Sequence, residues 1–378
     1  MKFLHLSDFH LGKKVNGFSM IKDQEHILNE IIKIMDEEKP DAVLIAGDIY
    51  DKPVPPVEAV NLLDDFLYKS ASCGVKVFMI SGNHDSAERL SFGARLMNDD
   101  GVHIAPTYDG KLEAIVLKDD FGEVAIYMLP FIKPINVRRY YEEETIESYD
   151  DAVRKAVENI DIDESKRNIL ISHQFVTGAL RSDSEEINIG GSDNISSEIY
   201  DAFDYTALGH IHRAQSAGKE NIRYCGTPLK YSFSEIKHIK SVSIVDLKEK
   251  GNIEIREAEL MPLHDMKELK GSYMELTSRN FYKDFDTDDY FRIILTDEED
   301  VPDAVGRLRT IYPNLMQIEY DNSRTRQGYS LESIDVIEEL SPTELFEQFF
   351  EKQNNKSMSE EQATYMNELI KKVWEDEA

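Results

Sequence analysis

Short polar clusters of aspartate, asparagine and histidine occur at five places along the chain. They read "SDFH", "GDIYD", "GNHD", "SHQ" and "GHIH", and each one comes where an apolar run ends. Carboxylate and imidazole donors without thiolates favour Mn²⁺, iron or Zn²⁺ and argue against a structural zinc cage. The residues of these clusters that could bind metal or transfer protons are Asp8, His10, Asp48, Asp51, Asn83, His84, His173, His210 and His212.

The number of donors predicts two ions that share a carboxylate, because about eight donor groups are too many for one ion. Two divalent ions about 3.5–4 Å apart can hold the attacking and leaving oxygens of an in-line phosphoryl displacement, and they lower the pKa of a water between them. His84, next to Asn83, is then left to protonate the leaving oxygen or to stabilise charge on the phosphorane. An imidazole in this role needs an orienting carboxylate, for which Asp51 is the candidate.

Taken singly, most of these clusters have a plainer explanation. A Gly-Asp pair commonly marks the exit from a strand into a turn, and a single histidine such as His173 is more often a hydrogen-bonded structural residue than a ligand. The clusters "GNHD" and "GHIH" are moderately specific. The strong signal is the occurrence of all five in this order down one chain.

The elements that carry these clusters are strands alternating with helices. The strand-like runs are "FLHLS", "AVLIAG", "KVFMIS", "VAIYMLP", "NILISH", "YTALGH" and "SVSIVDL", and amphipathic helices are predicted at "DQEHILNEIIKIMDEE" and "PPVEAVNLLDDFLYKSAS". Strand–helix alternation followed by further strands predicts a layered α/β domain with a mixed sheet. Open sheets gather ligands beyond the carboxyl ends of their strands, so the clusters are expected at one rim.

At these clusters the sequence resembles the calcineurin-like metallophosphoesterases and, more narrowly, the SbcD subunits of bacterial SbcC–SbcD (Mre–Rad type) nucleases. The narrower resemblance rests on "LHLSDFHLGK", "GNHDSAERL", "INIGGSDNISSEIYDAFDYTALGHIHRAQ" and "IRYCGTPLKYSFSE". It implies an α/β sandwich of mixed β-sheets flanked by helices, the metallophosphoesterase nuclease domain, over residues 1–262. Beyond about residue 260 the resemblance rests on layout only.

The resemblance also assigns each donor a place. It implies one Mn²⁺ bound by Asp8, His10, Asp48 and His212. It implies a second Mn²⁺, bound by Asp48, Asn83, His173 and His210, with Asp48 bridging. Mg²⁺ or another divalent ion could replace Mn²⁺ in both places. His84 would be the catalytic histidine, held by Asp51, and Arg89 is a weaker candidate for contact with DNA.

The segment after residue 262 reads strand, loop, strand, helix, strand, and the resemblance implies a small α+β DNA-capping domain over residues 263–332. Two amphipathic helices are predicted within residues 338–378. Their capping residues are Ser341, Pro342 and Glu344 for the first, and Ser359 and Gln362 for the second. Their apolar faces comprise Leu345, Phe346, Phe349 and Phe350, then Met366, Leu369, Ile370 and Val373. Docking on the chain's own domain and docking on another chain explain these faces about equally well.

The resemblance implies partners and a reaction. Members of the family trim duplex DNA ends in the 3′→5′ direction and nick single strands and hairpins, in DNA repair, recombination and replication. They act as a homodimer bound to an SbcC-type ABC ATPase, whose coiled coil meets helices C-terminal to the nuclease. The formal net charge of −30 disfavours unaided binding to a phosphate backbone. Candidate phosphate contacts are Arg138, Arg139, Arg181, Arg213 and Arg223, although scattered arginines are more often ordinary surface residues.

Two cysteines, Cys73 and Cys225, occur without a CxxC pattern, and no apolar run approaches the length of a membrane span. We therefore expect a cytoplasmic protein without a membrane contact. Two alternatives to the nuclease remain open at this point. One is a phosphatase or cyclic-nucleotide phosphodiesterase on the same fold, because the metal donors alone do not choose the substrate. The other is a scaffold that has kept the fold and lost the chemistry, which the complete donor set argues against.

Overall fold

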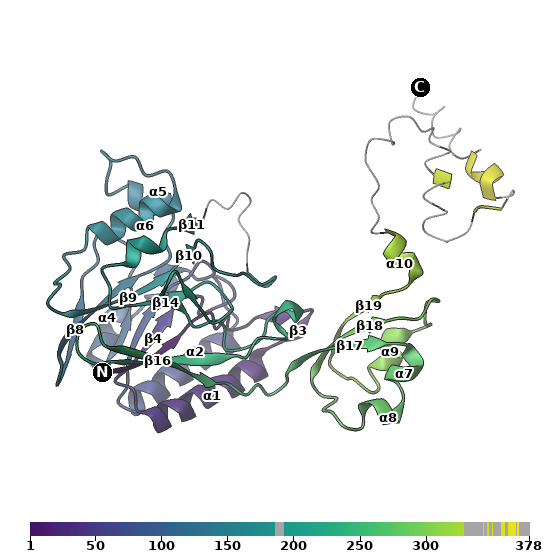
Figure 1. Cartoon of the computed structure of the whole chain (residues 1–378), viewed down its shortest axis with the longest axis horizontal. Coiled ribbons are helices and arrows are strands. Elements are labelled where there is room, and N and C mark those ends of the chain that lie inside the picture. The colour runs from purple at the N-terminus through teal and green to yellow at the C-terminus, as the bar shows by residue number, and fades with distance from the viewer. Residues whose placement is uncertain are drawn as a thin grey trace. The chain divides into compact units, whose positions relative to one another are not determined.

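The chain divides into two compact units, residues 1–266 and residues 267–378. The computed structural model describes residues 1–185, 193–328, 343, 346–347, 350, 357–359, 362–367 and 369. The first unit contains two six-stranded sheets, and the second contains a three-stranded sheet with short helices (Figure 1). The protein is therefore of the α/β class, as predicted.

The first sheet has the strand order β16-β15-β1-β4-β5-β6. Its strands are β1 (Lys2–Leu6), β4 (Ala42–Ala46), β5 (Lys76–Ile80), β6 (Val102–Ile104), β15 (Ser241–Leu247) and β16 (Ile253–Glu259). The first four are parallel, while β15 runs antiparallel to β1 and to β16. Parallel neighbours need crossover connections, and helices α1 (Ile21–Glu38) and α2 (Val57–Ser72) supply two of them.

The second sheet has the order β13-β14-β12-β9-β8-β7. Its strands are β7 (Ile115–Asp119), β8 (Gly122–Leu129), β9 (Arg167–His173), β12 (Tyr205–Gly209), β13 (Gln215–Ala217) and β14 (Lys219–Tyr224). Strands β8, β9, β12 and β14 are parallel. Across the two sheets, all seven strand-like runs predicted from the sequence form strands. Both predicted helices also form helices.

The two sheets pack face to face around a shared apolar core. Phe3, Leu44 and Phe78 of the first sheet belong to the same buried cluster as Ile171 and Ala207 of the second. The strands β4 and β9 are buried along their whole length, which explains why their sequences are continuous apolar runs rather than alternating ones. On its other face the second sheet is covered by helix α6 (Tyr149–Glu158) (Figure 1).

Local sequence signals fix the ends of the long helices. Helix α1 buries Ile27, Ile31 and Met35 at helical spacing and ends at Lys39, which has a left-handed backbone with φ 49°. Helix α6 begins with a reciprocal capping box, in which Ser148 accepts from the Asp151 N–H and Asp151 accepts from the Ser148 N–H. A cap of this kind stabilises a helix by about 1 kcal/mol.

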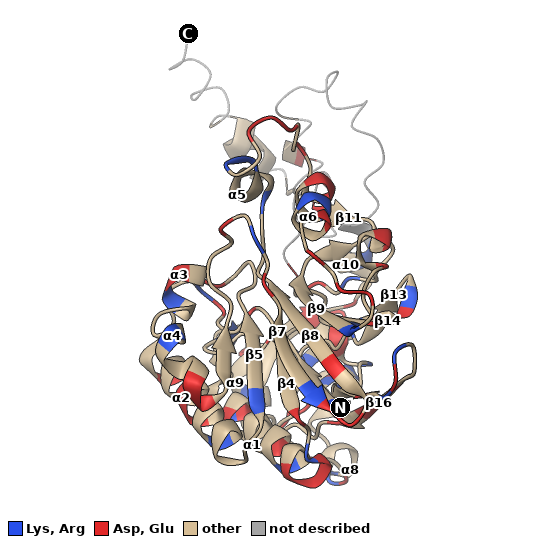
Figure 2. Cartoon of the chain, turned by 90° about the vertical axis from the view of Figure 1, so that its left-hand side faces the viewer, with Lys and Arg blue, Asp and Glu red and all other residues tan. Residues whose placement is uncertain are grey.

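Shorter elements complete the first unit. They are β2 (Lys14–Val15), β3 (Phe18–Ser19), α3 (Ala87–Leu90), α4 (Ala94–Met97), η1 (Asn98–Asp100), α5 (Pro134–Arg138), β10 (Phe175–Val176), β11 (Asn194–Ile195), η2 (Ser197–Tyr200) and η3 (Phe233–Glu235). The strands of the central sheets carry few charged residues, whereas helices such as α1 and α6 carry both signs (Figure 2). This distribution is expected when charged side chains face water and apolar ones fill the sandwich.

The second unit has the strand order β17-β18-β19. Its elements are β17 (Met266–Gly271), α7 (Tyr273–Leu276), α8 (Arg279–Tyr282), β18 (Tyr290–Leu295), α9 (Ala304–Leu308), β19 (Leu315–Tyr320) and α10 (Ser323–Gly328). The helices pack on the sheet around Leu276, Phe291 and Tyr312, and the Tyr312 hydroxyl donates to the Leu276 carbonyl at 2.7 Å. The two short helices α7 and α8 occupy the segment that the sequence predicted as a loop.

One of the two predicted C-terminal caps lies within the described residues. The Ser359 N–H donates to Gln362 Oε1 at 3.0 Å, the Gln362 N–H donates to Ser359 Oγ at 3.3 Å, and residues 362–367 are helical. The predicted residues Ser341, Pro342, Glu344, Leu345, Phe349, Ile370 and Val373 lie outside the described residues. In the described part of the chain, no helix is both long and apolar enough to cross a bilayer.

Candidate metal centre

The carboxyl ends of five parallel strands bring the predicted donors to one rim of the sandwich. Asp8 follows β1, Asp48 follows β4, Asn83 follows β5, His173 ends β9 and His210 follows β12. Ligand atoms of Asp8, Asp48 and His173 lie within 4.8 Å of one another, and so do those of Asp8, His10 and His212. The structure therefore brings together side chains that are up to about two hundred residues apart in sequence.

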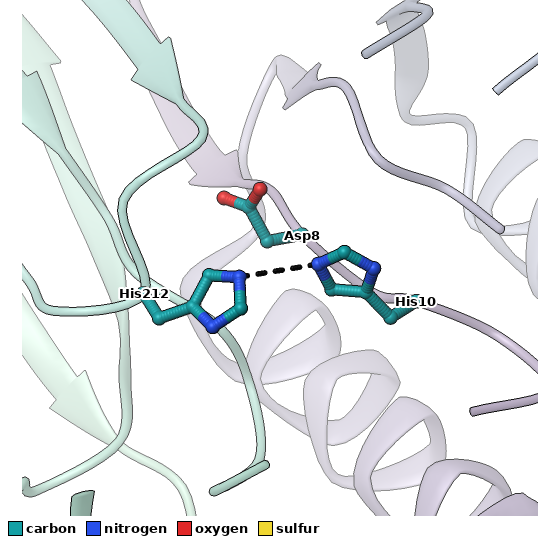
Figure 3. A group of neighbouring side chains, drawn as sticks. All are labelled: Asp8, His10 and His212. Carbon is teal, nitrogen blue, oxygen red and sulfur yellow. Dashed lines mark hydrogen bonds between the residues drawn. The ribbon is translucent and has the colours of Figure 1, made fainter. Parts of the chain in front are cut away.

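The first cluster consists of Asp8, His10 and His212. The two imidazoles face each other with their Nε2 atoms 3.2 Å apart, and Asp8 lies beside them (Figure 3). All three residues are buried. His10 Nε2 is also 3.7 Å from Asp48 Oδ2, so Asp48 borders this cluster.

The second cluster consists of Asn83, His173 and His210. The Asn83 Oδ1 atom lies 3.0 Å from His173 Nε2 and 3.0 Å from His210 Nδ1. His173 Nε2 is 3.4 Å from the same Asp48 Oδ2 atom that borders the first cluster. Asp48 thus lies beside histidines of both clusters. Asp8 also has ligand atoms within 4.8 Å of His173 as well as of His10 and His212.

The backbone at these positions is unusual for residues with a side chain. Asp8, His10, Asp48 and His210 have φ values of 53°, 44°, 49° and 99°, in or near the left-handed region. Each such residue costs about 1–3 kcal/mol, and such strain concentrates at functional sites. Here it turns the chain abruptly after each strand, so that the next side chain faces the rim.

Two glycines let the strand ends approach closely. A Cβ atom on Gly82 would lie 2.1 Å from Asp48 Oδ1, and one on Gly209 would lie 1.8 Å from the Ala46 carbonyl oxygen. Both distances are far below van der Waals contact. The glycine in "GNHD" and the one in "GHIH" are therefore required by the fit of neighbouring strand ends.

Hydrogen bonds outside the clusters fix the orientation of two imidazoles. His173 Nδ1–H donates to the Ala46 carbonyl at 2.7 Å, which leaves the Nε2 lone pair directed at Asp48 and Asn83. Ser184 Oγ donates to Glu235 at 2.5 Å and so accepts from His212 Nδ1–H at 2.6 Å. His212 therefore presents its Nε2 lone pair to His10, as a metal-binding histidine does.

Sequence reasoning missed this supporting layer. Glu235 is fully buried and also accepts from Lys240 Nζ at 2.5 Å, while Glu185 accepts from the His212 N–H at 2.7 Å. Asp85, although part of "GNHD", was given no role, yet it accepts from the N–H groups of Ile49, Tyr50 and Gly82 at 3.1, 2.9 and 2.9 Å. Its place in "GNHD", directly after His84, was the available signal, whereas no sequence signal marked Ser184 or Glu235.

The expected pairing of His84 with the Asp51 carboxylate is replaced by a different contact. His84 Nδ1–H donates to the backbone carbonyl of Asp51 at 3.0 Å. The Asp51 carboxylate instead binds Lys13 Nζ at 2.7 Å and lies 3.9 Å from His10 Nδ1. Asp51 thus orients His84 through its main chain, which fixes the tautomer as a carboxylate would. His84 Nε2 lies 3.9 Å from Asp48 Oδ2 at the edge of the clusters.

The charge balance of the two clusters fits divalent cations. Burial raises the pKa of the Asp8 carboxyl to about 8. Burial would lower the pKa of His173, but the Asp48 charge raises it to about 9. The Asp48 carboxylate thus favours positive charge at this position, which a bound cation would supply in place of a proton. His10 Nδ1 is buried without a hydrogen-bond partner in the described part of the chain, so this ring, unlike those of His173 and His212, lacks the outer hydrogen bond that usually orients a metal-binding histidine.

The arginines proposed from the sequence as phosphate contacts have varied surroundings. Arg138 and Arg139 donate to the carbonyls of Ile146 and Tyr108. Arg181 pairs with Asp193 at 3.3 Å, and Arg223 pairs with Glu257. Arg213 is exposed and follows His212 directly. Arg89 is exposed on α3 and lines a cavity with Tyr50 and Phe92, away from the two clusters.

Comparisons with known proteins agree with this geometry. Residues 1–214 match the calcineurin-like phosphoesterase family, and residues 262–354 match a domain described as the type 5 capsule protein repressor C-terminal domain. The chain is 30% identical over 377 residues to the SbcD subunit of the SbcCD nuclease of Staphylococcus epidermidis, covering 98% of each chain. A crystal structure of a dimetal phosphatase from Danio rerio aligns with 70% of this chain and with 98% of its own chain. The two sequences are 12% identical, and the TM-score is 0.39.

The first of these matches spans more than half of the chain, and the Staphylococcus relative matches nearly all of it. Both agree with the resemblance found in the sequence motifs and with the buried aspartate–histidine clusters at the strand ends. The chain belongs to the calcineurin-like phosphoesterases, as a metal-dependent phosphodiesterase of the SbcD nuclease-subunit family.

Proposed function

We propose that this chain is the nuclease subunit of an SbcCD-type complex, which hydrolyses phosphodiester bonds of DNA with two Mn²⁺ ions. The observation that carries the proposal is the position of Asp48, whose Oδ2 lies 3.7 Å from His10 Nε2 and 3.4 Å from His173 Nε2. One carboxylate within reach of both clusters is what two ions with a shared ligand require.

The assignment of ligands follows the two clusters. Asp8, His10, Asp48 and His212 would hold one ion, and Asp48, Asn83, His173 and His210 the other. When bound, the ions supply positive charge for the attacking and leaving oxygens and a water of lowered pKa. The chain's own part is to hold the donors: Ser184 and Glu235 fix the His212 ring, and Ala46 fixes the His173 ring.

His84 is proposed as the proton donor to the leaving oxygen. Its bond to the Asp51 carbonyl keeps the proton on Nδ1, so Nε2 is the atom that exchanges protons with a substrate. The side chain is 16% exposed, whereas those of His10 and His173 are almost completely buried. A substrate can therefore reach His84 from solvent, as general acid catalysis requires.

From the relationship to the family we propose two nuclease activities. One is 3′→5′ exonuclease action on duplex DNA, and the other is endonuclease action on single strands and hairpins. We also propose that residues 263–332 cap the DNA and that the C-terminal helices, residues 338–378, bind the coiled coil of an SbcC-type ATPase. The match over 98% of the nuclease subunit of Staphylococcus epidermidis supports both assignments. The cytoplasmic location stays a prediction.

A homodimer is proposed through helices α2, α3 and α4. Val57 and Tyr68 on α2 are 71% and 73% exposed, Leu96 on α4 is 82% exposed, and Phe92 between α3 and α4 is 85% exposed. Leu63, Phe92 and Met97 line one apolar cavity of about 580 Å³, so the helices form a continuous face. Soluble monomers rarely expose apolar faces of this kind. Phe92→Glu should give a monomer in sedimentation experiments, and an unchanged mass would move the dimer contact elsewhere.

Hairpin DNA and p-nitrophenyl phosphate esters separate the proposed nuclease from a small-molecule phosphatase or cyclic-nucleotide phosphodiesterase. We expect Mn²⁺-dependent cleavage of a labelled hairpin that disappears on chelation and returns with Mn²⁺. If only the small esters are hydrolysed, with or without an ATPase partner, the nuclease proposal is wrong. If a cyclic nucleotide is turned over faster than DNA at equal concentration, the phosphodiesterase alternative takes its place.

A further inference from the structure

A second, smaller cavity adjoins the metal centre on the far side of His212. Its volume is about 200 Å³, and it is lined by His212, Arg213, Lys237, His238, Ser241 and Glu257, among others. Because β15 runs antiparallel to β1, Ser241 at the start of β15 lies at the same rim as the carboxyl end of β1. The cavity thus borders the metal centre at one residue, His212, whose backbone carbonyl accepts from Lys240 Nζ at 2.9 Å.

The charges around this cavity favour an anion. Arg213 and Lys237 are exposed, and neither has a carboxylate within 4.0 Å in the described part of the chain. The one carboxylate on the wall, Glu257, is paired with Arg223. Lys240 at the base is neutralised by Glu235. The cavity therefore keeps the positive charge of two side chains, on a protein whose formal net charge is −30.

Two polar atoms in the wall lack partners. Ser241 is 4% exposed, and its Oγ is buried without a hydrogen bond; His238 Nδ1 is buried and unpartnered as well. Only nine side-chain nitrogen and oxygen atoms of the described residues are in this state, and two of them lie on this one small cavity. Leaving buried polar groups without a hydrogen-bond partner costs free energy, which indicates that a polar ligand supplies the missing hydrogen bonds.

We propose that this cavity binds a phosphate group of the DNA strand, next to the phosphate that is cleaved. Phosphate oxygens accept from guanidinium, ammonium and hydroxyl groups, which Arg213, Lys237 and Ser241 supply. His212 belongs both to the cavity lining and to the first cluster, so an anion here occupies a neighbouring position on the strand. The inference rests on the proposed nuclease function and names how that site holds its substrate.

The test compares DNA with an ester that has no second phosphate. The double variant Arg213→Ala/Lys237→Ala removes two positive charges at the cavity. Its matched control, Lys76→Ala/Lys118→Ala, removes two exposed charges near the amino ends of β5 and β8, at the opposite rim. The KM for cleavage of labelled single-stranded DNA is measured at several KCl concentrations, beside the hydrolysis of bis(p-nitrophenyl) phosphate.

We expect the double variant to raise the KM for DNA by about tenfold and to lower the slope of log KM against log salt by about 0.7, the contribution of one phosphate of a single strand. Ester hydrolysis and the control variant should match the wild type. Ser241→Ala should also raise the KM for DNA without lowering the denaturation midpoint, because the hydroxyl has no partner within the protein whose loss would destabilise it.

Three results would overturn the inference. The double variant could keep the wild-type KM and salt slope for DNA; the control could lose as much as the double variant; or ester hydrolysis could fall in step with DNA cleavage, which would locate the effect in the metal centre. Failure of the proposed function has a different signature, since the wild type itself would then hydrolyse the ester and leave DNA intact.

Discussion

Gly82→Ala is the substitution for which the structure gives the most direct consequence. The new methyl carbon would lie 2.1 Å from Asp48 Oδ1 and 2.4 Å from the Asp48 backbone nitrogen, whereas real Cβ contacts stay beyond 3.0 Å. The Asp48 carboxylate must therefore move by about 0.9 Å to relieve the closest contact. Because Asp48 is the proposed shared ligand, this movement is transmitted to both clusters at once.

The expected cost can be estimated in two parts. Inserting a methyl group into a well-packed site costs about 1–3 kcal/mol of folding free energy. Displacing a catalytic group by about 1 Å can lower the rate by about 10²-fold. We expect kcat/KM for the p-nitrophenyl ester to fall by about 10²-fold and the Mn²⁺ content after dialysis to drop, with the protein still folded at 25 °C.

Gly271→Ala is the matched control. Its backbone does not have a positive φ, and the added carbon would meet Glu275 Oε2, the far end of a flexible side chain, at 2.8 Å. It should keep the wild-type metal content and activity. If Gly82→Ala retained both as well, the close approach of the β4 and β5 ends would have no bearing on the site, and the geometric reasoning would be refuted.

Three further substitutions test other parts of the site. His84→Gln should lower kcat by about 10²-fold or more while leaving two metal ions bound by elemental analysis, because a general acid typically contributes 10²–10⁴-fold; unchanged activity would remove His84 from the mechanism. Ser184→Ala should weaken one of the two Mn²⁺ sites by about 10–100-fold in a titration, since it holds the His212 ring; equal loss at both sites would contradict the assignment. Asp119 bonds Arg167 and the chain's amino terminus: burial would raise its pKa, but these bonds hold it well below the ordinary value. The stabilisation by these bonds is therefore present above about pH 4 and is lost as pH falls through the lowered pKa. In urea titrations, Asp119→Asn should lower the free energy of unfolding more at about pH 7 than at about pH 2. An equal loss of unfolding free energy at the two pH values would contradict the pairing.

The sequence predicted the sheets and the gathering of donors because both depend on simple local patterns. Short apolar runs such as "AVLIAG" and "NILISH", bounded by polar residues, favour buried strands in a layered domain, and a polar residue directly after a parallel strand lies at the carboxyl rim. Once β1 and β4 are parallel neighbours, the convergence of Asp8 and Asp48 follows. His173 ends β9 of the second sheet, so its approach to them depends on how the two sheets pack face to face.

The parts that could not be predicted depend on contacts between distant segments. Ser184 reaches His212 from a turn and Glu235 from the three-residue helix η3, and both segments are too short to carry a periodic signal, so nothing local marks them. The contact between Asp51 and His84 was expected through the carboxylate, and the structure makes it through the main chain. Sequence spacing shows that two residues are near each other but cannot distinguish a side-chain oxygen from a carbonyl oxygen. Helices α7 and α8 are each only four residues long, too short for a periodic pattern.

A chain with 73 acidic and 43 basic residues can still act on a polyanion, because the phosphate at the rim responds to the charges near it. At physiological salt the interactions of exposed charges are screened within about 8 Å, so most surface carboxylates contribute little at the site. Close to the site are the two proposed cations and, on the adjoining cavity, Arg213 and Lys237, which have no carboxylate partner in the described part of the chain. The buried acids at the rim, Asp8 and Asp48, are themselves the ligands proposed to hold the cations. The local field that a DNA strand meets is therefore set by the metal centre and its neighbouring cavity, and the acidic surface acts mainly against strands that approach elsewhere.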